Sequence, residues 1–407
     1  MPDVSVLDVR LYGKPIATLT HLQGDRAIFA FNQSYVDDPQ RPTLSLSFKD
    51  SFGGLITDFA SVQRVVPPFF SNLLPEGPLR RYLAQRAGIK PEREFFLLWM
   101  LGQDLPGAVS VHAPDNESLP PAGDTEPERR LREGALRFSL AGVQLKFSAV
   151  QNDGRGSGLR IPVTGTGGSW IVKLPSQQFA GVPENEFSMM TIAGMLGMDV
   201  PDVSLIALDA IEGLPKGLGD FSGPAYAVRR FDRTAAGPVH IEDFAQVFGI
   251  FPDDKYNKAT YRRIAHVLGI EAGTAGVAEF TRRLVFSTLI GNADMHVKNW
   301  SLIYPDARTP ALAPAYDLLS TVPYIPDATA ALRYSRTRKM TEFSTDELRH
   351  LAGKAALPEK HVLDTAAETV ARFRHVWAAE KKNLPLMKTV VDAIDGHLPT
   401  IPIYGEL

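Results

Sequence analysis

The stretch over residues 289–299 constrains the chain most, because it places two polar groups at a fixed spacing directly after a long apolar segment. These groups are the carboxylate of Asp294 and the amide of Asn299, and a second carboxylate, Asp317, follows further along the chain. The apolar run before the stretch predicts a buried helix. Gly291 predicts a break that exposes the residues after it.

An Asp followed five residues later by an Asn, with a further Asp downstream, matches the needs of phosphoryl transfer. One group orients the attacking hydroxyl, and two oxygen ligands hold Mg²⁺ against the nucleotide phosphates. In a protein-kinase catalytic loop the Asp accepts the substrate proton, while the Asn and the later Asp bind metal. This spacing arises by chance about once in a chain of such length. Its place after a buried helix and before a predicted strand at 300–304 gives it weight.

Composition bounds the alternatives. A chain of 407 residues has room for two or three domains, and 44% hydrophobic with 22% charged residues is ordinary for globular proteins. The formal net charge of -3 disfavours autonomous DNA binding. The absence of cysteine excludes disulfides, thiolate nucleophiles and Cys-ligated zinc. We expect a cytoplasmic location without membrane contact, because no signal peptide or membrane span is recognisable.

The first part of the chain predicts a small unit of strands and helices. Strands are expected over residues 4–12, 16–19, 27–31 and 107–111, and helices over 78–87 and 92–101. Proline and acidic residues then interrupt the apolar pattern between residues 113 and 133, which predicts a linker or loop. A domain boundary is expected there.

The remainder predicts strands followed by helices. Strands are expected at 136–138, 145–150, 170–175, 203–208 and 225–233, with one helix at 184–196. Further helices are expected at 241–248, 258–268 and 277–290, and Ser344 with Glu347 predicts the start of another. Strands, one helix and strands again is the order of a kinase small lobe.

Two lysines are candidates for binding phosphate. Lys173 ends an apolar strand, where its ammonium can pair with nucleotide phosphates if a helix carboxylate, Glu186 or alternatively Glu184, holds it. Lys146 follows a loop over residues 139–144, which carries a single glycine and therefore matches neither common nucleotide-binding pattern. Backbone N–H groups in that loop can still cradle a phosphate. The alternative is an ordinary hairpin.

Two residues inside the catalytic stretch carry further hypotheses. Lys298 is a candidate for neutralising the transferred phosphoryl group, and His296 is a structural hydrogen-bonding group or a nucleotide contact. The nine histidines show no paired ligand spacing, so we predict no zinc site. The absence of a GxSxG elbow disfavours a serine hydrolase.

Seven segments in order make the chain resemble the HipA family of bacterial toxin–antitoxin serine/threonine kinases. They cover nearly the whole chain and are specific jointly rather than singly. The segments are residues 72–77, 102–108, 138–146, 171–173, 230–233, 294–299 and 316–320. Asp317-Leu318-Leu319 stands in place of the more usual Asp-Phe-Gly.

The resemblance implies an α+β fold: a bilobal protein-kinase-like fold, with a mixed small lobe and an all-helical large lobe, behind an additional N-terminal α/β domain. The expected domains are residues 1–112, a linker at 113–133, a small lobe at 134–236 and a large lobe at 237–407. The resemblance also implies ATP and Mg²⁺ as cofactors, with Asp294 as catalytic base and Asn299 and Asp317 as metal ligands. The expected nucleotide contacts are Lys173, Lys146, Ala141, Gly142, Val143, Arg230, Phe231 and His296.

The resemblance implies partners as well. These are a HipB-like helix-turn-helix antitoxin that binds operator DNA, and a protein substrate, in this family typically an aminoacyl-tRNA synthetase such as glutamyl-tRNA synthetase. DNA is then reached only through the antitoxin. Ser139 is the expected site of an inactivating autophosphorylation, whose nearly two negative charges would oppose ATP binding. Two alternatives stay open: a small-molecule phosphotransferase of the same broad fold, and a non-catalytic pseudokinase that acts as a co-repressor.

Overall fold

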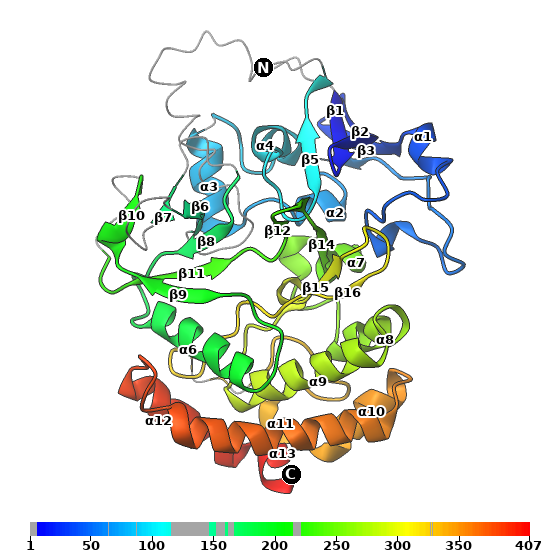
Figure 1. Cartoon of the computed structure of the whole chain (residues 1–407). Coiled ribbons are helices and arrows are strands. Elements are labelled where there is room, and N and C mark those ends of the chain that lie inside the picture. Colours follow the sequence, from blue (N-terminus) through cyan, green and yellow to red (C-terminus); the bar gives the residue numbers. More distant parts are fainter. Residues whose placement is uncertain are drawn as a thin grey trace.

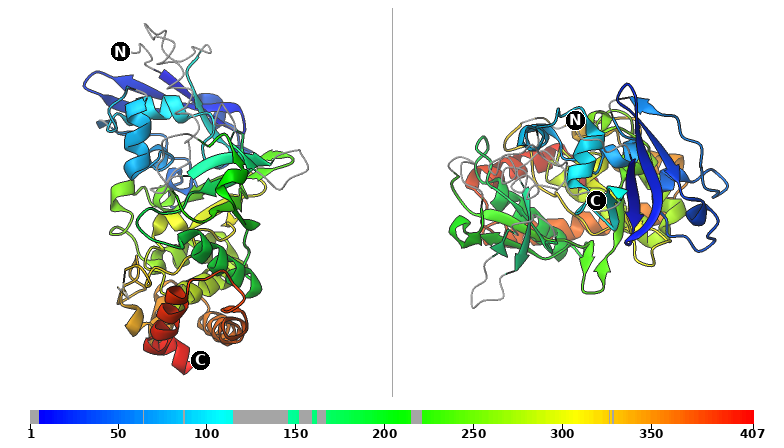
Figure 2. Two further views of the ribbon diagram at one scale, coloured as in Figure 1. Left: turned by 90° about the vertical axis from the view of Figure 1, so that its left-hand side faces the viewer. Right: turned by 90° about the horizontal axis from the view of Figure 1, so that it is seen from above.

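The computed structural model describes residues 6–63, 65–86, 88–114, 146–151, 159–161, 167–214, 221–325, 327 and 329–407. Its long axis runs from an N-terminal sheet at one end to the C-terminal helices at the other (Figures 1 and 2). A second sheet and the catalytic stretch lie between these ends.

The N-terminal sheet follows from an alternation of buried and less buried residues. In β1 (Val6–Leu11) the side chains of Leu7, Val9 and Leu11 are buried, and the residues between them are not. The sheet has five antiparallel strands in the order β4-β3-β2-β1-β5. The other strands are β2 (Lys14–Leu22), β3 (Arg26–Phe31), β4 (Val62–Gln63) and β5 (Val109–His112). The predicted meander and closing strand are confirmed.

Short helices accompany this sheet. Every residue of α4 (Glu94–Leu101) is buried, as its apolar sequence predicts. Its one charged residue, Glu94, accepts hydrogen bonds from Ser71 at 2.8 Å and from Arg80 at 2.9 Å. The other helices of this unit are α1 (Gln33–Val36), α2 (Pro68–Ser71) and α3 (Gly77–Arg86).

The second sheet and one helix form the small lobe. Its strands lie in the order β10-β7-β6-β8-β11-β9. Helix α6 (Val182–Met195) connects β8 to β9 and packs against β9 and β11 (Figure 1). The strands are β6 (Lys146–Gln151), β7 (Leu159–Arg160), β8 (Trp170–Lys173), β9 (Val203–Ile206), β10 (Ile211–Glu212) and β11 (Ala225–Arg229). This order of strands and helix agrees with the predicted kinase-like small lobe, and the strand predicted at residues 136–138 lies outside the described residues.

The large lobe is mainly helical, but the prediction of an all-helical lobe is wrong, because the lobe also contains a three-stranded sheet of order β14-β15-β16. The long helix α11 lies along α9. A hairpin of β12 (Arg233–Thr234) and β13 (Gly237–Pro238) precedes the lobe. The strands and α-helices of the large lobe are β14 (His240–Asp243), α7 (Phe244–Val247), α8 (Tyr261–Glu271), α9 (Gly273–Leu289), β15 (Ser301–Tyr304), β16 (Ala311–Leu312), α10 (Thr345–Lys354), α11 (Glu359–Glu380), α12 (Lys388–His397) and α13 (Pro402–Glu406).

The predicted helix over residues 241–248 is wrong in its first half. Residues 240–243 form β14, which pairs with β15. The helix begins only at Phe244, because Asp243 and Gln246 form a reciprocal capping box with two bonds of 2.8 Å. A local cap and a distant strand therefore override the apolar pattern.

Two hydrophobic cores run through the molecule, and neither stops at a predicted domain limit. One core joins the N-terminal sheet to the upper face of the small lobe, including Phe147 and Val172. The other joins α6 to the large lobe, including Met190 and Phe286. The limits at residues 112, 134 and 237 therefore stay a prediction, although the strands belong to different sheets near two of them. The linker predicted over residues 113–133 lies outside the described residues, apart from its first two positions.

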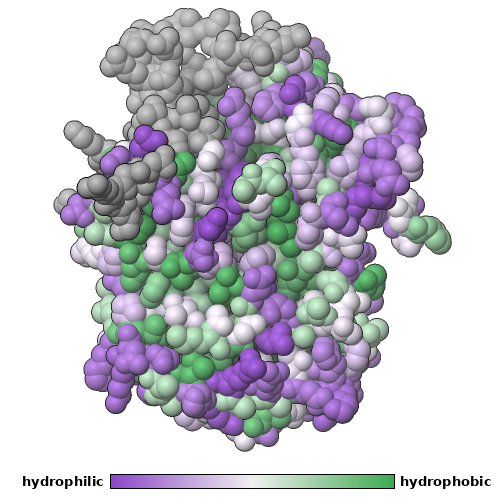
Figure 3. Space-filling model, viewed as in Figure 1, coloured by the Kyte–Doolittle hydropathy of each residue, from purple (hydrophilic) through white to green (hydrophobic). Residues whose placement is uncertain are grey.

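The visible surface is mixed in character. Polar and charged residues cover much of the edge where α10 and α12 lie, and apolar residues appear in small groups nearer the middle (Figure 3). Among the described residues, no helix is both long enough and apolar enough to cross a membrane.

Candidate active site

Helix α9 carries the chain to the catalytic stretch and stops at a glycine. Gly291 has a positive φ of 64°. A Cβ atom at this position would lie only 2.6 Å from Cγ1 of Val322. Both the left-handed backbone and the close approach require glycine here, which turns the following loop out of the helix.

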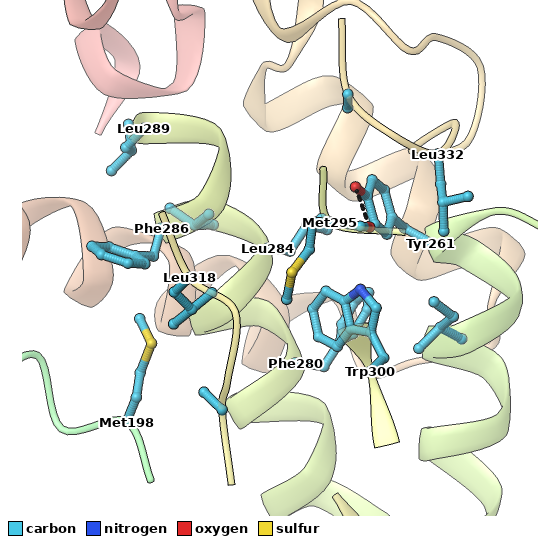
Figure 4. Close-up of a cluster of buried hydrophobic side chains, with 14 of the residues drawn as sticks. Met198, Tyr261, Phe280, Leu284, Phe286, Leu289, Met295, Trp300, Leu318 and Leu332 are labelled. Carbon is cyan, nitrogen blue, oxygen red and sulfur yellow. Dashed lines mark hydrogen bonds between the residues drawn. The ribbon is translucent and has the colours of Figure 1, made fainter. Parts of the chain in front are cut away.

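The loop after Gly291 is anchored from below by the large-lobe core. Met295 lies among the side chains of Phe280, Leu284 and Trp300 (Figure 4). The hydroxyl of Tyr261 donates to the carbonyl oxygen of Met295 at 3.0 Å. One buried side chain and one backbone bond therefore fix the residue directly after Asp294.

Asp294 and Asn299 are joined within this loop. The Nδ2 group of Asn299 donates to the backbone carbonyl of Asp294 at 2.8 Å. This bond uses the nitrogen of the amide, so the amide oxygen is the atom left to bind a cation. The hydroxyl of Tyr256 donates to Oδ1 of Asp294 at 2.5 Å, and the N–H of Asp294 donates to Asn292 at 3.0 Å.

Asp317, itself partly exposed, meets the small lobe through an ion-pair network whose other members, Lys173 and Glu186, are buried. Lys173 at the end of β8 donates to Glu186 of α6 at 2.6 Å and also contacts Oδ1 of Asp317. Asp317 has a positive φ of 53°, which aspartate tolerates better than most residues. Burial opposes ionisation of Asp317, but the ammonium groups of Lys173 and Lys146 outweigh it and hold its pKa at about 2.

The same network assigns the partner of Lys173. Burial raises the pKa of Glu186 to about 7, even though Lys173 opposes this shift. The two carboxylates outweigh the burial of Lys173 and raise the pKa of its ammonium. Glu186 rather than Glu184 holds the lysine, as the first of the two predicted choices stated.

Two clamps hold the segment after Asp317. The side chain of Asn185 donates to the carbonyl of Ser320 at 2.8 Å and accepts from the N–H of Ser320 at 3.1 Å. The hydroxyl of Thr321 accepts from Ala293 at 2.8 Å and donates to the carbonyl of Gly291 at 2.9 Å. These hydrogen bonds join helix α6 to the segment after Asp317, and join that segment to the loop that contains Asp294.

Lys146 stands opposite Lys173 in the register of β6 and β8. Burial lowers the pKa of Lys146 to about 8. The carboxylate of Asp317 opposes this shift, and the nearby charge of Lys173 adds to it. Both predicted phosphate-binding lysines therefore lie at the predicted metal ligand Asp317. Ser139, Ala141, Gly142 and Val143 lie outside the described residues.

His296 and Lys298 are both enclosed. The imidazole of His296 packs edge-on against Tyr256 with ring centroids 5.0 Å apart, and burial lowers its pKa to about 4. It is therefore neutral near pH 7. Lys298 contacts Oε1 of Glu76 at 2.8 Å and the carbonyl of Asn72 at 3.0 Å. Its charge is already paired with a carboxylate of the N-terminal domain.

Arg230 is engaged in a buried network between the N-terminal domain and the small lobe. Its guanidinium contacts Asp104 at 3.0 Å and Asp232 at 2.9 Å. Arg233 contacts the same two carboxylates at 2.9 and 2.8 Å, and the N–H of Gly107 donates to Asp232 at 2.8 Å. The guanidinium of Arg230 is thus bound to two carboxylates at the domain contact, and its predicted contact with a nucleotide stays a prediction.

Phe231 lies beside the segment that contains Asp317. Its ring centroid is 5.9 Å from that of Tyr316, the residue before Asp317. The hydroxyl of Tyr316 in turn donates to the carbonyl of Lys298 at 2.8 Å. Phe231 therefore stays a candidate for an apolar contact to a nucleotide base.

The donor set fits magnesium better than a metal held by protein alone. Among the described residues, no group of three or more His, Asp or Glu side chains is arranged to hold a metal ion. Magnesium commonly takes one or two protein oxygens and completes its shell with phosphates and water. The oxygen atoms of Asn299 and Asp317 are donors of that kind.

Sequence reasoning missed three contributors to this site. Tyr256 carried no motif, so nothing in the sequence pointed to its contact with Asp294. Glu76 and Asp104 lay in segments quoted for the family resemblance, but their roles depend on residues over a hundred positions away. Their place in segments that resemble the HipA family was the one sequence signal that could have indicated these two residues.

The fold and this set of groups define a protein-kinase-like molecule. The sequence profile of the HipA N-terminal domain matches residues 7–112, and that of the HipA-like C-terminal domain matches residues 138–377. The chain therefore belongs to the HipA family.

Relatives named as kinases match the chain, two of them over more than nine tenths of its length. The chain is 68% identical to the putative kinase Y4dM of Sinorhizobium fredii, covering 100% of this chain and 99% of that one. It is 33% identical to the putative kinase Y4mE of the same organism, covering 91% and 92%. It is 27% identical to the serine/threonine-protein kinase toxin HipA of Shewanella oneidensis, covering 66% of each.

A solved structure supports the fold. HipA in the complex of Shewanella oneidensis HipA, HipB and operator DNA matches with a TM-score of 0.73 at 21% identity, covering 97% of this chain and 96% of that chain. The expected α+β kinase-like fold with an additional N-terminal domain is therefore confirmed.

Proposed function

We propose that this chain is an ATP- and Mg²⁺-dependent serine/threonine-protein kinase. One arrangement carries the proposal: Asp294 and Asn299 are joined in one loop, while Asp317 meets the Lys173–Glu186 pair. A base, two oxygen ligands and a phosphate-binding lysine are the groups that phosphoryl transfer uses.

Each group has a role in the proposed reaction. Asp294 orients the substrate hydroxyl and accepts its proton, while Lys173 and Lys146 bind phosphate oxygens. Asn299 and Asp317 would hold Mg²⁺, which neutralises phosphate charge when bound. Lys298 can assist the phosphoryl group only if it gives up part of its contact with Glu76. His296 contributes shape rather than charge, because its low pKa keeps it neutral.

We further propose that the chain is the toxin of a toxin–antitoxin module. Family membership supports this, and the Shewanella oneidensis relative occurs in a complex with HipB and operator DNA. A HipB-like helix-turn-helix antitoxin is the expected partner, with DNA reached only through it. The expected protein substrate is an aminoacyl-tRNA synthetase such as glutamyl-tRNA synthetase, whose phosphorylation would slow translation and growth and favour persistence. Such partners place the chain in the cytoplasm.

Self-inactivation is part of the proposal. A phosphate on Ser139 would add nearly two negative charges. Transfer between two molecules is expected, because a loop that covers a nucleotide cannot easily reach its own catalytic base. Wild type incubated with ATP should gain one phosphate at Ser139, and the rate should rise with protein concentration. An unmodified Ser139 in an active preparation would contradict this step.

Labelling tests the substrate class. Purified chain, radiolabelled ATP and Mg²⁺ are added to a bacterial lysate, and labelled proteins are identified by mass spectrometry. We expect a labelled serine or threonine in an aminoacyl-tRNA synthetase. Label on a small molecule alone would favour the small-molecule phosphotransferase alternative, and no transferred label would favour the pseudokinase.

A further inference from the structure

One carboxylate of the N-terminal domain reaches the catalytic loop. Glu76 immediately precedes α3, far from residues 294–299 in sequence. Its Oε1 lies 2.8 Å from Nζ of Lys298, and its Oε2 lies 2.8 Å from Nζ of Lys255. The two oxygen atoms of a single side chain thus bind two ammonium groups of the large lobe.

Each of these lysines is the chain neighbour of a group in the proposed reaction. Lys298 directly precedes Asn299, whose amide nitrogen donates to the carbonyl of Asp294 at 2.8 Å. Lys255 directly precedes Tyr256, whose hydroxyl donates to Oδ1 of Asp294 at 2.5 Å. Glu76 therefore fastens two separate segments, and both of them contact Asp294.

The contact is enclosed, which strengthens it. Side-chain exposure is 7% for Lys298 and 12% for both Glu76 and Lys255. Burial alone would raise the pKa of Glu76, but the two ammonium groups lower it to about 2. The side chain is therefore ionised throughout the physiological range.

A second residue of the same domain supports the arrangement. The carbonyl of Asn72 accepts from Lys298 at 3.0 Å. The side chain of Asn72 is itself fixed, because its Nδ2 donates to the carbonyls of Pro68 and Ile250, each at 2.8 Å. The neighbouring carboxylate, Asp243, stands further from Lys298, at 4.0 Å. The position of Lys298 is thus set mainly from the N-terminal domain.

Other contacts hold the domains together without Glu76. Asp104 pairs with Arg230 on the small-lobe side, and the carbonyl of Leu44 bonds the ring of His240 at 2.7 Å. The hydroxyl of Thr43 donates to the carbonyl of Arg308 at 3.0 Å. The docking of the domain therefore rests on several independent contacts, whereas Glu76 alone among these bridges both segments around Asp294.

We propose that Glu76 is a positioning residue of the transfer reaction, through which the N-terminal domain aligns the catalytic base and the neighbouring metal ligand. The inference rests on the proposed kinase function. It gives the N-terminal domain a part in the reaction that is separate from any antitoxin contact. It also explains why Lys298 is paired with Glu76: the ion pair fixes the backbone next to Asn299.

The test replaces the carboxylate by its neutral isostere. In Glu76→Gln the amide has a similar shape, but it cannot bind two ammonium groups with both ends. Lys298 and Lys255 then repel each other and the loop loosens. Because a displacement of about 1 Å can cost roughly a hundredfold in rate, we expect kcat to fall about 10- to 100-fold. The KM for ATP and the ATP–Mg²⁺ melting shift should change much less than kcat, since Lys173 and Asp317 are untouched and Asn299 is the one proposed nucleotide or metal contact that Glu76 positions.

Two further variants separate positioning from docking. Thr43→Val removes one hydrogen bond of the same interface away from the loop, and it should keep the wild-type kcat. Lys255→Met should lower kcat as well, and its combination with Glu76→Gln should lower it less than the two single effects added, because both act through one contact. A wild-type kcat in Glu76→Gln, with Asp294→Asn inactive, would overturn the inference and leave the proposed function standing.

Amide hydrogen exchange tests the positioning role without relying on kinase activity. If the wild type transfers no phosphate, the proposed function fails, and amide hydrogen exchange of residues 291–300 decides the structural claim. Exchange should become faster in Glu76→Gln than in wild type or Thr43→Val. Equal exchange in all three proteins would contradict the positioning role.

Discussion

The hydroxyl of Tyr256 lies 2.5 Å from Oδ1 of Asp294, so a residue outside the catalytic loop holds the proposed base by one oxygen. The other oxygen is then the one available to a substrate hydroxyl. Tyr256→Phe should lower kcat about tenfold, equivalent to about 1.4 kcal/mol, with little change in the KM for ATP. An unchanged kcat would contradict this positioning role, and a higher kcat would show instead that the phenol blocks the base.

The Lys173 network predicts a loss of stability. Lys173→Met leaves the buried Glu186 and the partly exposed Asp317 without the cation that contacts both, and among the described lysines only Lys146 remains nearby. The free energy of unfolding, measured by urea denaturation, should fall by about 3–5 kcal/mol.

A double variant tests whether the loss of stability comes from uncompensated charge. Adding Glu186→Gln to Lys173→Met should recover part of the lost stability, because one uncompensated charge is removed. Neither variant should retain the full ATP–Mg²⁺ melting shift. A stable Lys173→Met protein with a wild-type shift would move the phosphate role to Lys146.

Gly291 predicts a backbone and packing effect at the start of the loop. Gly249 has a similar φ of 62°, and a Cβ atom there would meet nothing within 4 Å. Gly249→Ala should therefore cost only the left-handed conformation, about 1–2 kcal/mol. Gly291→Ala meets Val322 in addition, so its unfolding free energy should be lower by a further 1–3 kcal/mol or so. Equal losses in the two variants would refute the close approach.

Glu242 predicts a pH dependence of stability. This carboxyl of β14 accepts hydrogen bonds from Ser45 and Tyr304, and burial raises its pKa from 4.5 to about 7. Between these values the folded state binds more protons than the unfolded state. Wild-type stability from this group is therefore full below pH 4.5 and is lost as pH rises through 7, by up to about 3 kcal/mol.

The matched variant isolates this contribution. Glu242→Gln cannot titrate, so the stability of wild type relative to the variant should decrease between pH 4.5 and pH 7. Urea denaturation at several pH values measures the difference. A difference that stays constant, or one that grows with pH, would show that the carboxyl does not titrate in this way.

Local patterns predicted most of the architecture. The alternation in residues 6–11 predicted β1, and the apolar run of residues 94–101 predicted α4. The pair Asp294 and Asn299 was found through its spacing together with its place between a predicted buried helix and a predicted strand. Lys173 and Glu186 were correctly paired by position, because the order of a strand and the following helix brings them together.

Contacts between distant segments could not be predicted in the same way. No local pattern indicates that Tyr256 turns toward Asp294, or that Glu76 reaches Lys298. Residues 240–243 read as helix because their pairing with β15 depends on a strand about sixty positions later. The ion pair of Arg230 with Asp104 could not be predicted either, because the carboxylate comes from a segment over a hundred positions earlier.

The central claim is that Asp294 accepts the substrate proton during phosphoryl transfer. Its direct test is the initial rate of phosphate transfer from radiolabelled ATP to the labelled substrate protein, for wild type and for Asp294→Asn at equal concentration. The variant should keep its melting temperature and its ATP–Mg²⁺ shift, and its rate should fall by about two to four orders of magnitude. A rate equal to that of wild type in a folded, ATP-binding variant would contradict the account.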